Sequence, residues 1–469
     1  KAPWSPSHPR SLRFATPRLH SKSARTASNR LSVQRRPTPW SVAPTQSSSR
    51  AQAAPETFCL FVASPDFMSK VAAAFESMDY GPAPESPAPA DAFLDAHNRR
   101  FGVFINNTWA FPPGRAMAAS VDPCTGAKLA ESVEGTREDV DAAVAAAAGA
   151  LPAWKALPGH ARARFMYAIA RGLQKHAKLL SVLEALDNGK TIRETRDLDV
   201  PLAIRHFYHH AGWAQVMDSE VRGYEAVGVV GAIIPWNFPL LMLAWKVAPA
   251  LATGCTIVLK PAPSTRLTAW AFCQIVLEAG IPAGVVNVVS GDNDMAQHLS
   301  THPGLDKIAF TGSTPVGRSI RKSLAGTGCK LTMELGGKSA MVVFQGADLD
   351  SATEGCVDAI WMNQGQVCCA GSRLLVQESI APLLLAKLRR RLTTLRLGNS
   401  MDKCVDMAAI HTPAQLEKIT RYVELGRAEG AQIDQAPGAP DVAGCKGGSF
   451  FPATLITGLQ TASRLSQEE

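Results

Sequence analysis

The segment Gly228–Lys260, GVVGAIIPWNFPLLMLAWKVAPALATGCTIVLK, decides the fold of this chain of 469 residues. One apolar run begins at Gly228, a turn with two prolines follows it, and a second apolar run begins at Thr256. Pro239 suits the first turn of a helix between them, because that turn leaves its N–H groups without partners in any case. The segment therefore predicts a strand, a helix and a second strand, and no membrane span, although residues 226–245 carry no charge.

The same spacing continues along the chain. Further apolar runs begin at Gly284, Lys307 and Lys330, so that five runs follow one another at intervals of 28, 28, 23 and 23 residues. These intervals suit strands joined by crossover helices, and uniformly apolar strands are typical of a parallel sheet covered on both faces. We predict a doubly wound, mostly parallel, Rossmann-type α/β domain over residues 75–336.

Several helix boundaries can be predicted around this sheet. Thr136 and Asp139 form an expected capping box that opens an Ala-rich helix, and further helical patterns cover residues 160–215. The helix after the second apolar run is expected to be capped by Ser264 and to end at Gly280.

A second α/β domain is predicted over residues 337–469. Its expected elements are a strand at 341–344, a helix opened by Asp350, a strand at 374–377, a helix at 383–395, a helix capped by Thr412 and Pro413, and a strand at 451–456.

The net charge of +8 is confined to the start of the chain. Residues 1–67 hold ten Lys or Arg and two Asp or Glu, and the rest of the chain holds 38 of each sign. A basic face for nucleic acid is therefore not expected. The Ser-, Pro- and Arg-rich composition of residues 1–67 predicts a disordered arm. It also resembles a mitochondrial targeting segment, but we favour upstream sequence before a natural start at Met68, and hence a cytoplasmic protein.

No metal or disulfide framework is indicated. The ten cysteines show no CxxC spacing. His206, His209 and His210 share a helical segment, but no acid or cysteine stands at ligand spacing beside them.

Two segments carry reactive side chains. Cys368 lies in the Gly-flanked loop NQGQVCCAGSR at 363–373, where a thiolate can face a cleft as a nucleophile. Glu334 ends an apolar strand before a Gly-Gly turn. We expect apolar surroundings that raise the pKa of this carboxylate, so that it can take a proton from water. Taken alone, a buried inert cysteine and a charge at a strand end remain open as alternatives.

Three more segments favour a dinucleotide site beside them. Gly312 and Ser313 follow one predicted strand and open a helix, whose N-terminus favours phosphate, although a packing turn explains the glycine equally well. Asn237 follows the first strand and can donate to an oxyanion, with an ordinary turn residue as the alternative. Lys260 ends the second strand and can bind ribose hydroxyls or phosphate, unless it is simply solvated.

With these residues identified, the chain resembles the aldehyde dehydrogenase superfamily from about Phe75 to Glu469. The pieces that carry the resemblance occur in the family's order: FINNTW, DPCTG, LDNGK, PWNFP, FTGSTPVG, MELGGKS and NQGQVCCAGSR. The wording MDYGPAPES and ETRDLDV looks most like the family 16 branch.

The resemblance implies a role for each matching residue. Cys368 would be the nucleophile, Glu334 the general base, and Asn237 with the Cys368 N–H the oxyanion hole. The residues implied to line a site for NAD, or alternatively NADP, are Trp236, Lys260, Gly291, Phe310, Gly312, Ser313, Leu335 and Glu469. The implied reaction oxidises a small-molecule aldehyde to a carboxylic acid through a thiohemiacetal and a thioester.

Three departures limit what the resemblance implies. Pro263 stands where the family often has an acid that selects NAD over NADP. A short hairpin is expected near 213–227, where the family has an oligomerisation hairpin, and we expect a homo-oligomer when the chain is full length. The family pattern would continue beyond Glu469, so we expect an incomplete catalytic domain and leave the activity of the fragment open. A catalytically inactive dinucleotide-binding scaffold is the competing reading.

Overall fold

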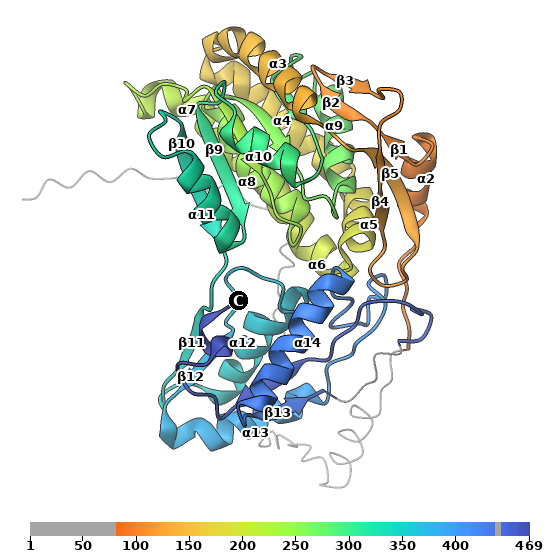
Figure 1. The fold of residues 1–469 in the computed structure, drawn as a ribbon, viewed down its shortest axis with the longest axis vertical. Helices are drawn as coiled ribbons and strands as arrows, with labels where there is room; N and C mark the ends of the chain where they lie inside the picture. The colour runs from red at the N-terminus through yellow and green to blue at the C-terminus, as the bar shows by residue number, and fades with distance from the viewer. Residues whose placement is uncertain (1–80, 437–441) are drawn as a thin grey trace, which may run out of the picture. The chain divides into compact units, whose positions relative to one another are not determined.

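The computed structural model describes residues 81–436 and 442–469, so the arm predicted for residues 1–67 lies outside the described residues. A seven-stranded sheet in the order β10-β9-β6-β7-β8-β2-β3 dominates residues 81–335 (Figure 1). Its first five strands are parallel, which confirms the predicted doubly wound sheet. The strands are β2 (Val103–Ile105), β3 (Thr108–Ala110), β6 (Val229–Ile233), β7 (Thr256–Lys260), β8 (Val286–Val288), β9 (Lys307–Gly312) and β10 (Lys330–Leu335).

Helices cover both faces of this sheet because its central strands are apolar on both sides. Val229 and Ile233 of β6 pack with α3, α10 and α11, whereas Val230 and Ala232 point to the opposite face and pack with α4, α5, α7, α8 and α9. The helices are α3 (Arg137–Ala156), α4 (Gly159–Lys175), α5 (Ala177–Asn188), α7 (Val200–Glu220), α8 (Pro239–Ala252), α9 (Leu267–Glu278), α10 (Asn293–Thr301) and α11 (Thr314–Ser323).

The strand order brings two predicted site segments together. β6 lies between β7 and β9, so the chain leaves it toward one side of the sheet and later returns on the other. In a parallel sheet this switch point opens a crevice at the carboxyl ends of the two central strands. Ile233 pairs with Phe310 in that register, so the segment that contains Asn237 follows β6 beside the segment that contains Gly312.

Both predicted helix starts at Thr136 and Pro239 are confirmed. Thr136 and Asp139 form the capping box of α3, and Pro239 is the first residue of α8. The predicted cap at Ser264 is wrong, because α9 begins three residues later, where the Asp187 carboxylate accepts the N–H of Leu267 at 2.9 Å.

The hairpin expected near 213–227 is not formed. Helix α7 continues to Glu220, because its last turns contain the helix formers Ala214, Gln215 and Met217. The seven residues 221–227 form a turn and an extended stretch without strand pairing among the described residues. Seven residues are too few for two paired strands and their turn.

Two two-stranded sheets lie in the described part of residues 337–469; β11, β12 and β14 overlap predicted strands, whereas β13 was not predicted. β11 (Ala340–Val343) pairs in parallel with β12 (Arg373–Val376), and β13 (Gln432–Gln435) pairs antiparallel with β14 (Thr454–Thr457). Asp348 rather than the expected Asp350 caps the first helix, because its carboxylate accepts the N–H of Ser351 at 2.7 Å. The helices are α12 (Leu349–Trp361), α13 (Ala381–Leu392), α14 (Pro413–Ala428), which Thr412 caps as predicted, and α15 (Arg464–Gln467).

The remaining elements lie at the start of the described chain and between α5 and α7. A three-stranded sheet has the order β1-β5-β4. These elements are α2 (Ala88–Ala96), β1 (Arg100–Phe101), β4 (Met117–Val121), β5 (Lys128–Val133), α6 (Ile192–Glu194) and the π-helical turn η1 (Thr195–Asp199). Among the described residues, no single helix is long and apolar enough to span a membrane, and only the bent pair α3 and α4 passes that test jointly.

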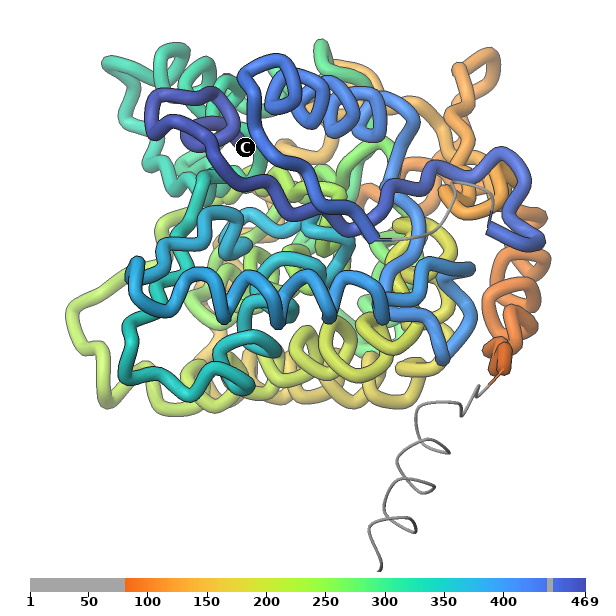
Figure 2. The backbone as a smooth tube through the Cα atoms, turned by 90° about the horizontal axis from the view of Figure 1, so that it is seen from below, coloured from red at the N-terminus to blue at the C-terminus, as the bar shows by residue number. Residues whose placement is uncertain are grey.

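The boundary predicted between residues 336 and 337 stays a prediction. The described residues belong to one compact unit, although the large sheet ends at Leu335 and the next strand begins at Ala340. Figure 2 follows the backbone to its C-terminal segment, which runs beside α14 with the Tyr422 hydroxyl 2.5 Å from Glu468 Oε2.

Candidate active site

A cavity of about 920 Å³ collects most of the predicted site residues. It extends from the carboxyl ends of β6 and β9 to α14 and the C-terminal segment. Seven of the eleven predicted residues line it, namely Trp236, Asn237, Gly312, Ser313, Glu334, Cys368 and Glu469. Segments separated by up to 233 positions, from Trp236 to Glu469, therefore meet around one space.

The loop before Cys368 has an unusual backbone. Asn363, Gln364 and Gly365 all have positive φ, at 49°, 55° and 76°. This left-handed conformation is unfavourable for most residues, although asparagine tolerates it better than others. The turn places Cys368, which is half-buried, on the cavity wall.

The environment of Cys368 favours its neutral thiol in this state. Burial raises the pKa of Cys368, and the adjacent Cys369 thiol and the Glu469 carboxylate raise it further. Its backbone N–H donates to no oxygen of another described residue. That N–H therefore remains available as a donor to an oxyanion.

Asn237 faces the cysteine loop. Its side-chain Nδ2 donates to the carbonyl oxygen of Gln366, two residues before Cys368, at 2.9 Å. A primary amide has two N–H donors, so a second one remains for a substrate oxygen. The turn that contains Asn237 is held by Asn188, whose Nδ2 donates to the carbonyl oxygen of Trp236 at 2.7 Å.

Glu334 lines the same cavity but is exposed, contrary to the apolar surroundings expected for it. The reason is that β10 is an edge strand, so its residues alternate between exposed and half-buried positions. Burial lowers the pKa of Lys246 on α8, and the nearby Glu334 carboxylate partly opposes this. Because Glu334 is exposed, its carboxylate can contact water, as a base for hydrolysis must.

Lys260 is buried, so the interpretation as a solvated lysine is wrong. Burial, with the nearby Arg266 guanidinium, lowers the pKa of Lys260 to about 8. Its ammonium donates to the carbonyl oxygen of Pro261 at the long distance of 3.3 Å. The carboxylates of Glu134 and Asp292 offset this shift only in part, and a buried ammonium of this kind is suited to binding a polar ligand.

The N-terminus of α11 offers further donors. Ser313 precedes this ten-residue helix, and its side chain makes no capping hydrogen bond. The buried Thr311 hydroxyl has no partner among the described residues and belongs to the cavity wall. Free donors at a helix N-terminus and an unpartnered hydroxyl fit the diphosphate of a dinucleotide.

Gly291, Gly312 and Leu335 also lie in close packing contacts. A methyl group added at Gly291 would lie 2.6 Å from the carbonyl oxygen of Gly135, and one at Gly312 would lie 2.7 Å from the Phe310 ring. Leu335 packs against Gly317 in the same way. Phe310 is buried, and neither it nor Gly291, Leu335 or Lys260 lines the cavity, so their contact with a cofactor stays a prediction.

The comparisons with known proteins agree with this geometry. Residues 110–469 match the model of the aldehyde dehydrogenase family. The chain is 39% identical over 385 residues to an aldehyde dehydrogenase of Agaricus bisporus, covering 78% of this chain and 76% of that protein. An aldehyde dehydrogenase of Alternaria alternata is 38% identical over 381 residues, with the same coverage.

The chain belongs to the aldehyde dehydrogenase family. A solved NAD+ complex of the Bacillus cereus aldehyde dehydrogenase has a TM-score of 0.77 and 35% identity, covering 82% of this chain and 80% of that one. Aldehyde dehydrogenase C of Pseudomonas syringae, solved as a mutant with NAD+ and octanal, has a TM-score of 0.74 and 30% identity, covering 80% and 78%. The resemblance to the family 16 branch stays a prediction.

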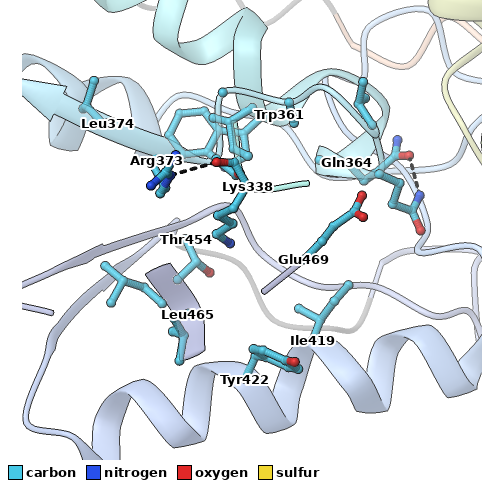
Figure 3. A pocket seen from close by; sticks show the side chains of 18 of the residues that line it. Lys338, Trp361, Gln364, Arg373, Leu374, Ile419, Tyr422, Thr454, Leu465 and Glu469 are labelled. Carbon is cyan, nitrogen blue, oxygen red and sulfur yellow. Dashed lines mark hydrogen bonds between the residues drawn. The ribbon is translucent and has the colours of Figure 1, made fainter. Parts of the chain in front are cut away.

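In this aldehyde dehydrogenase Glu469 lies against the Gly-Gly turn after β10. Any side chain at Gly336 would overlap the Glu469 carboxylate. Burial raises the pKa of Glu469, and the charges of Lys418 and Lys338 oppose the shift. Figure 3 shows the carboxylate in the cavity between Lys338 and Gln364. Its contact with a nicotinamide ribose stays a prediction.

Sequence reasoning missed the buried charges that support this family member's site. Lys190 and Asp199 are fully buried and joined at 2.7 Å, and Glu194 accepts the N–H of Asn363 at 2.5 Å. The segment LDNGK could have indicated them, because it places polar residues at the end of an apolar helix, but it was used only for the resemblance to the family. From sequence alone, a lysine at the end of a helix is expected to be solvated, because its buried partners lie in other segments.

One histidine cluster lies away from the cavity. Asp141 Oδ1 on α3 is 2.6 Å from Nε2 of His298 on α10 and 3.2 Å from Nε2 of His302, the residue that follows α10, a grouping that can hold a metal ion. However, His302 Nδ1 accepts the N–H of Gly304 at 3.0 Å, so the neutral ring carries its proton on Nε2. In this state the cluster is a hydrogen-bonded link between two helices.

Proposed function

We propose that the protein oxidises an aldehyde to a carboxylic acid with NAD, or alternatively NADP, using Cys368 as the nucleophile. The observation that carries the proposal is that Cys368, Asn237 and Glu334 line one cavity with the N-terminus of α11. A nucleophile, an oxyanion donor and a base have no reason to converge in a protein that only binds a dinucleotide.

The first step joins the thiol to the substrate. The Cys368 thiolate adds to the aldehyde carbon, forming a C–S bond, and the carbonyl electron pair moves to the oxygen. The Asn237 amide and the Cys368 N–H donate to that oxyanion. Because the pKa of Cys368 is raised in the free protein, a base or a nearby positive charge must assist its ionisation.

The dinucleotide site is proposed for the carboxyl ends of β7 and β9. Lys260 would bind ribose hydroxyls, while Thr311, Ser313 and the first N–H groups of α11 would hold the diphosphate. When bound, NAD supplies the acceptor for the hydride that leaves the former aldehyde carbon. Cys368 then holds the acyl group as a thioester.

Glu334 completes the cycle in this proposal. Its carboxylate takes a proton from water as the water oxygen attacks the thioester carbon. The C–S bond breaks, its electron pair returns to Cys368, and the carboxylic acid leaves. The exposed position of Glu334 gives it a supply of water and lets it pass the proton to solvent.

The test follows the absorbance of NADH and NADPH while the purified protein meets a panel of aliphatic and aromatic aldehydes. Cofactor reduction that needs both aldehyde and an intact Cys368 supports the proposal. Calorimetric binding of NAD without reduction by any aldehyde would instead favour the scaffold. Comparing the two nucleotides also tests whether Pro263, which is exposed after β7, leaves the adenosine site unselective.

A further inference from the structure

Asn363 is a buried residue in a backbone conformation that costs energy. Its exposed fraction is 1%, with φ of 49° and ψ of 37°. A non-glycine residue stays in the left-handed region only when its surroundings hold it there, and such residues cluster at functional sites. Both the side chain and the backbone N–H of Asn363 make hydrogen bonds to other segments that hold it in this conformation.

The side-chain amide of Asn363 joins two chain segments. Its Nδ2 donates to the carbonyl oxygen of Asn237 at 3.0 Å and to that of Gln366 at 3.2 Å. The Asn237 amide donates to the same Gln366 oxygen at 2.9 Å. One amide therefore ties the segment of the oxyanion donor to the loop that ends at Cys368.

The backbone of Asn363 is anchored to a third segment. Its N–H donates to Glu194 Oε1 at 2.5 Å, and Glu194 Oε2 accepts the Thr191 hydroxyl at 3.0 Å. Thr191 and Glu194 form the capping box of α6, so this carboxylate cannot swing freely. The strained turn is thus fastened to a helix outside the loop.

We propose that Asn363 is a positioning residue that sets the placement of the Asn237 amide relative to Cys368. The proposal rests on the proposed function, because it concerns the oxyanion hole of that reaction. Oxyanion donors act only within a narrow range of distance and angle, and misplacement by about 1 Å typically costs about 10²-fold in rate. The shared contact at the Gln366 carbonyl fixes that placement.

The first test replaces Asn363 by glycine. Glycine keeps the left-handed backbone without strain and removes the two hydrogen bonds of the side chain. We expect kcat to fall about 10- to 100-fold, while KM for aldehyde and the affinity for NAD change less than about threefold. A fall in kcat of less than about threefold would overturn the positioning role.

The matched control is Asn107→Gly. Asn107 also has positive φ, at 59°, and its Nδ2 also donates to a backbone carbonyl, that of Ile281, at 2.7 Å. It lies between β2 and β3 and does not line the cavity. We expect unchanged kcat here, and an equal loss in both variants would assign the effect to general weakening of the fold.

A double-mutant cycle identifies the route of the effect. If Asn363 acts through Asn237, then Asn363→Gly should lower kcat by less than about twofold in an Asn237→Ala background. If the fold-changes in kcat of the two single variants instead multiply in the double variant, the proposal is overturned. A wild-type protein that reduces no cofactor would refute the proposed function and this inference together, whereas an active wild type with multiplying effects refutes the inference alone.

Glu194 provides a second pair of variants in case Asn363→Gly does not fold. Glu194→Gln keeps a side-chain oxygen that can accept the Asn363 N–H, and Glu194→Ala removes it. We expect Gln to retain activity within about threefold of wild type and Ala to lower kcat about tenfold or more at similar KM. Equal kcat in the two variants, with thermal unfolding confirming that both fold, would contradict the anchoring of Asn363.

Discussion

The Lys190 ammonium donates to the main-chain carbonyl of Asn237 at 2.7 Å. The same nitrogen lies 2.7 Å from Asp199 Oδ2 and 3.9 Å from the centre of the Phe238 ring. Both charged side chains are fully buried. A buried ion pair thus supports the turn that presents the oxyanion donor.

We predict that Lys190→Met lowers the free energy of unfolding by about 3 to 5 kcal/mol, because it leaves the Asp199 carboxylate buried without its partner. Urea denaturation measures the change. Lys128→Met is the matched control, since Lys128 pairs with Glu131 at the surface, and its midpoint should not move. A loss below about 1 kcal/mol for Lys190→Met would show that Asp199 finds another partner or takes up a proton.

Asn237→Ala should slow the reaction without abolishing it. Removal of one oxyanion donor typically lowers kcat by about 10² to 10³-fold, and the Cys368 N–H remains as the second donor. Steady-state kinetics with NAD and a good aldehyde measure the loss. A change confined to KM would mean that Asn237 binds the substrate and the transition state equally.

The two adjacent cysteines should differ in their roles. Cys368 lines the cavity, whereas Cys369 is exposed and does not line it. We expect Cys368→Ser to lower NADH production to background and Cys369→Ser to retain most of it, because serine is a far weaker nucleophile. The reverse result would reassign the nucleophile to Cys369.

His411 should make stability depend on pH. Burial lowers its pKa from 6.5 to about 4. Between these values the unfolded chain binds a proton that the folded protein does not, so stability is lost as the pH falls from 6.5 to 4. The loss at this site is about 3 kcal/mol, as an order of magnitude.

The measurement compares urea denaturation of wild type and His411→Gln across that pH range. The difference between the two proteins isolates His411 from Glu184 and Asp187, whose pKa values burial raises to about 8 and about 7. A carboxyl group whose pKa is raised in the folded protein acts in the opposite sense, because it makes the folded protein lose stability as the pH rises. A difference that stays constant with pH would contradict the predicted titration of His411.

The large sheet was predictable because its signal is local. Each apolar run and each Gly or Pro boundary can be identified within a few residues, and β7 begins at Thr256 as expected. The exposure of Glu334 was not predictable, because it follows from the position of β10 at the sheet edge. Spacing along the chain does not state the order of strands in space.

The same distinction applies to the site. Cys368, Asn237 and Ser313 each lie in a segment whose turn chemistry can be recognised without the fold. The pairing of Lys190 with Asp199 depends on the π-helical turn η1 and on the approach of the segment after β6. Long-range pairs of this kind become visible only in three dimensions.

The central position of β6 restricts how its length can change. An insertion of one residue in this strand would move Asn237 by about 3.3 Å along the sheet relative to Ser313. It would also turn the side chains that follow to the opposite face. Insertions in the turn at Gly223, at the other end of β6, leave that relation intact. We therefore expect length variation among active variants of this chain to fall before β6 and not within it.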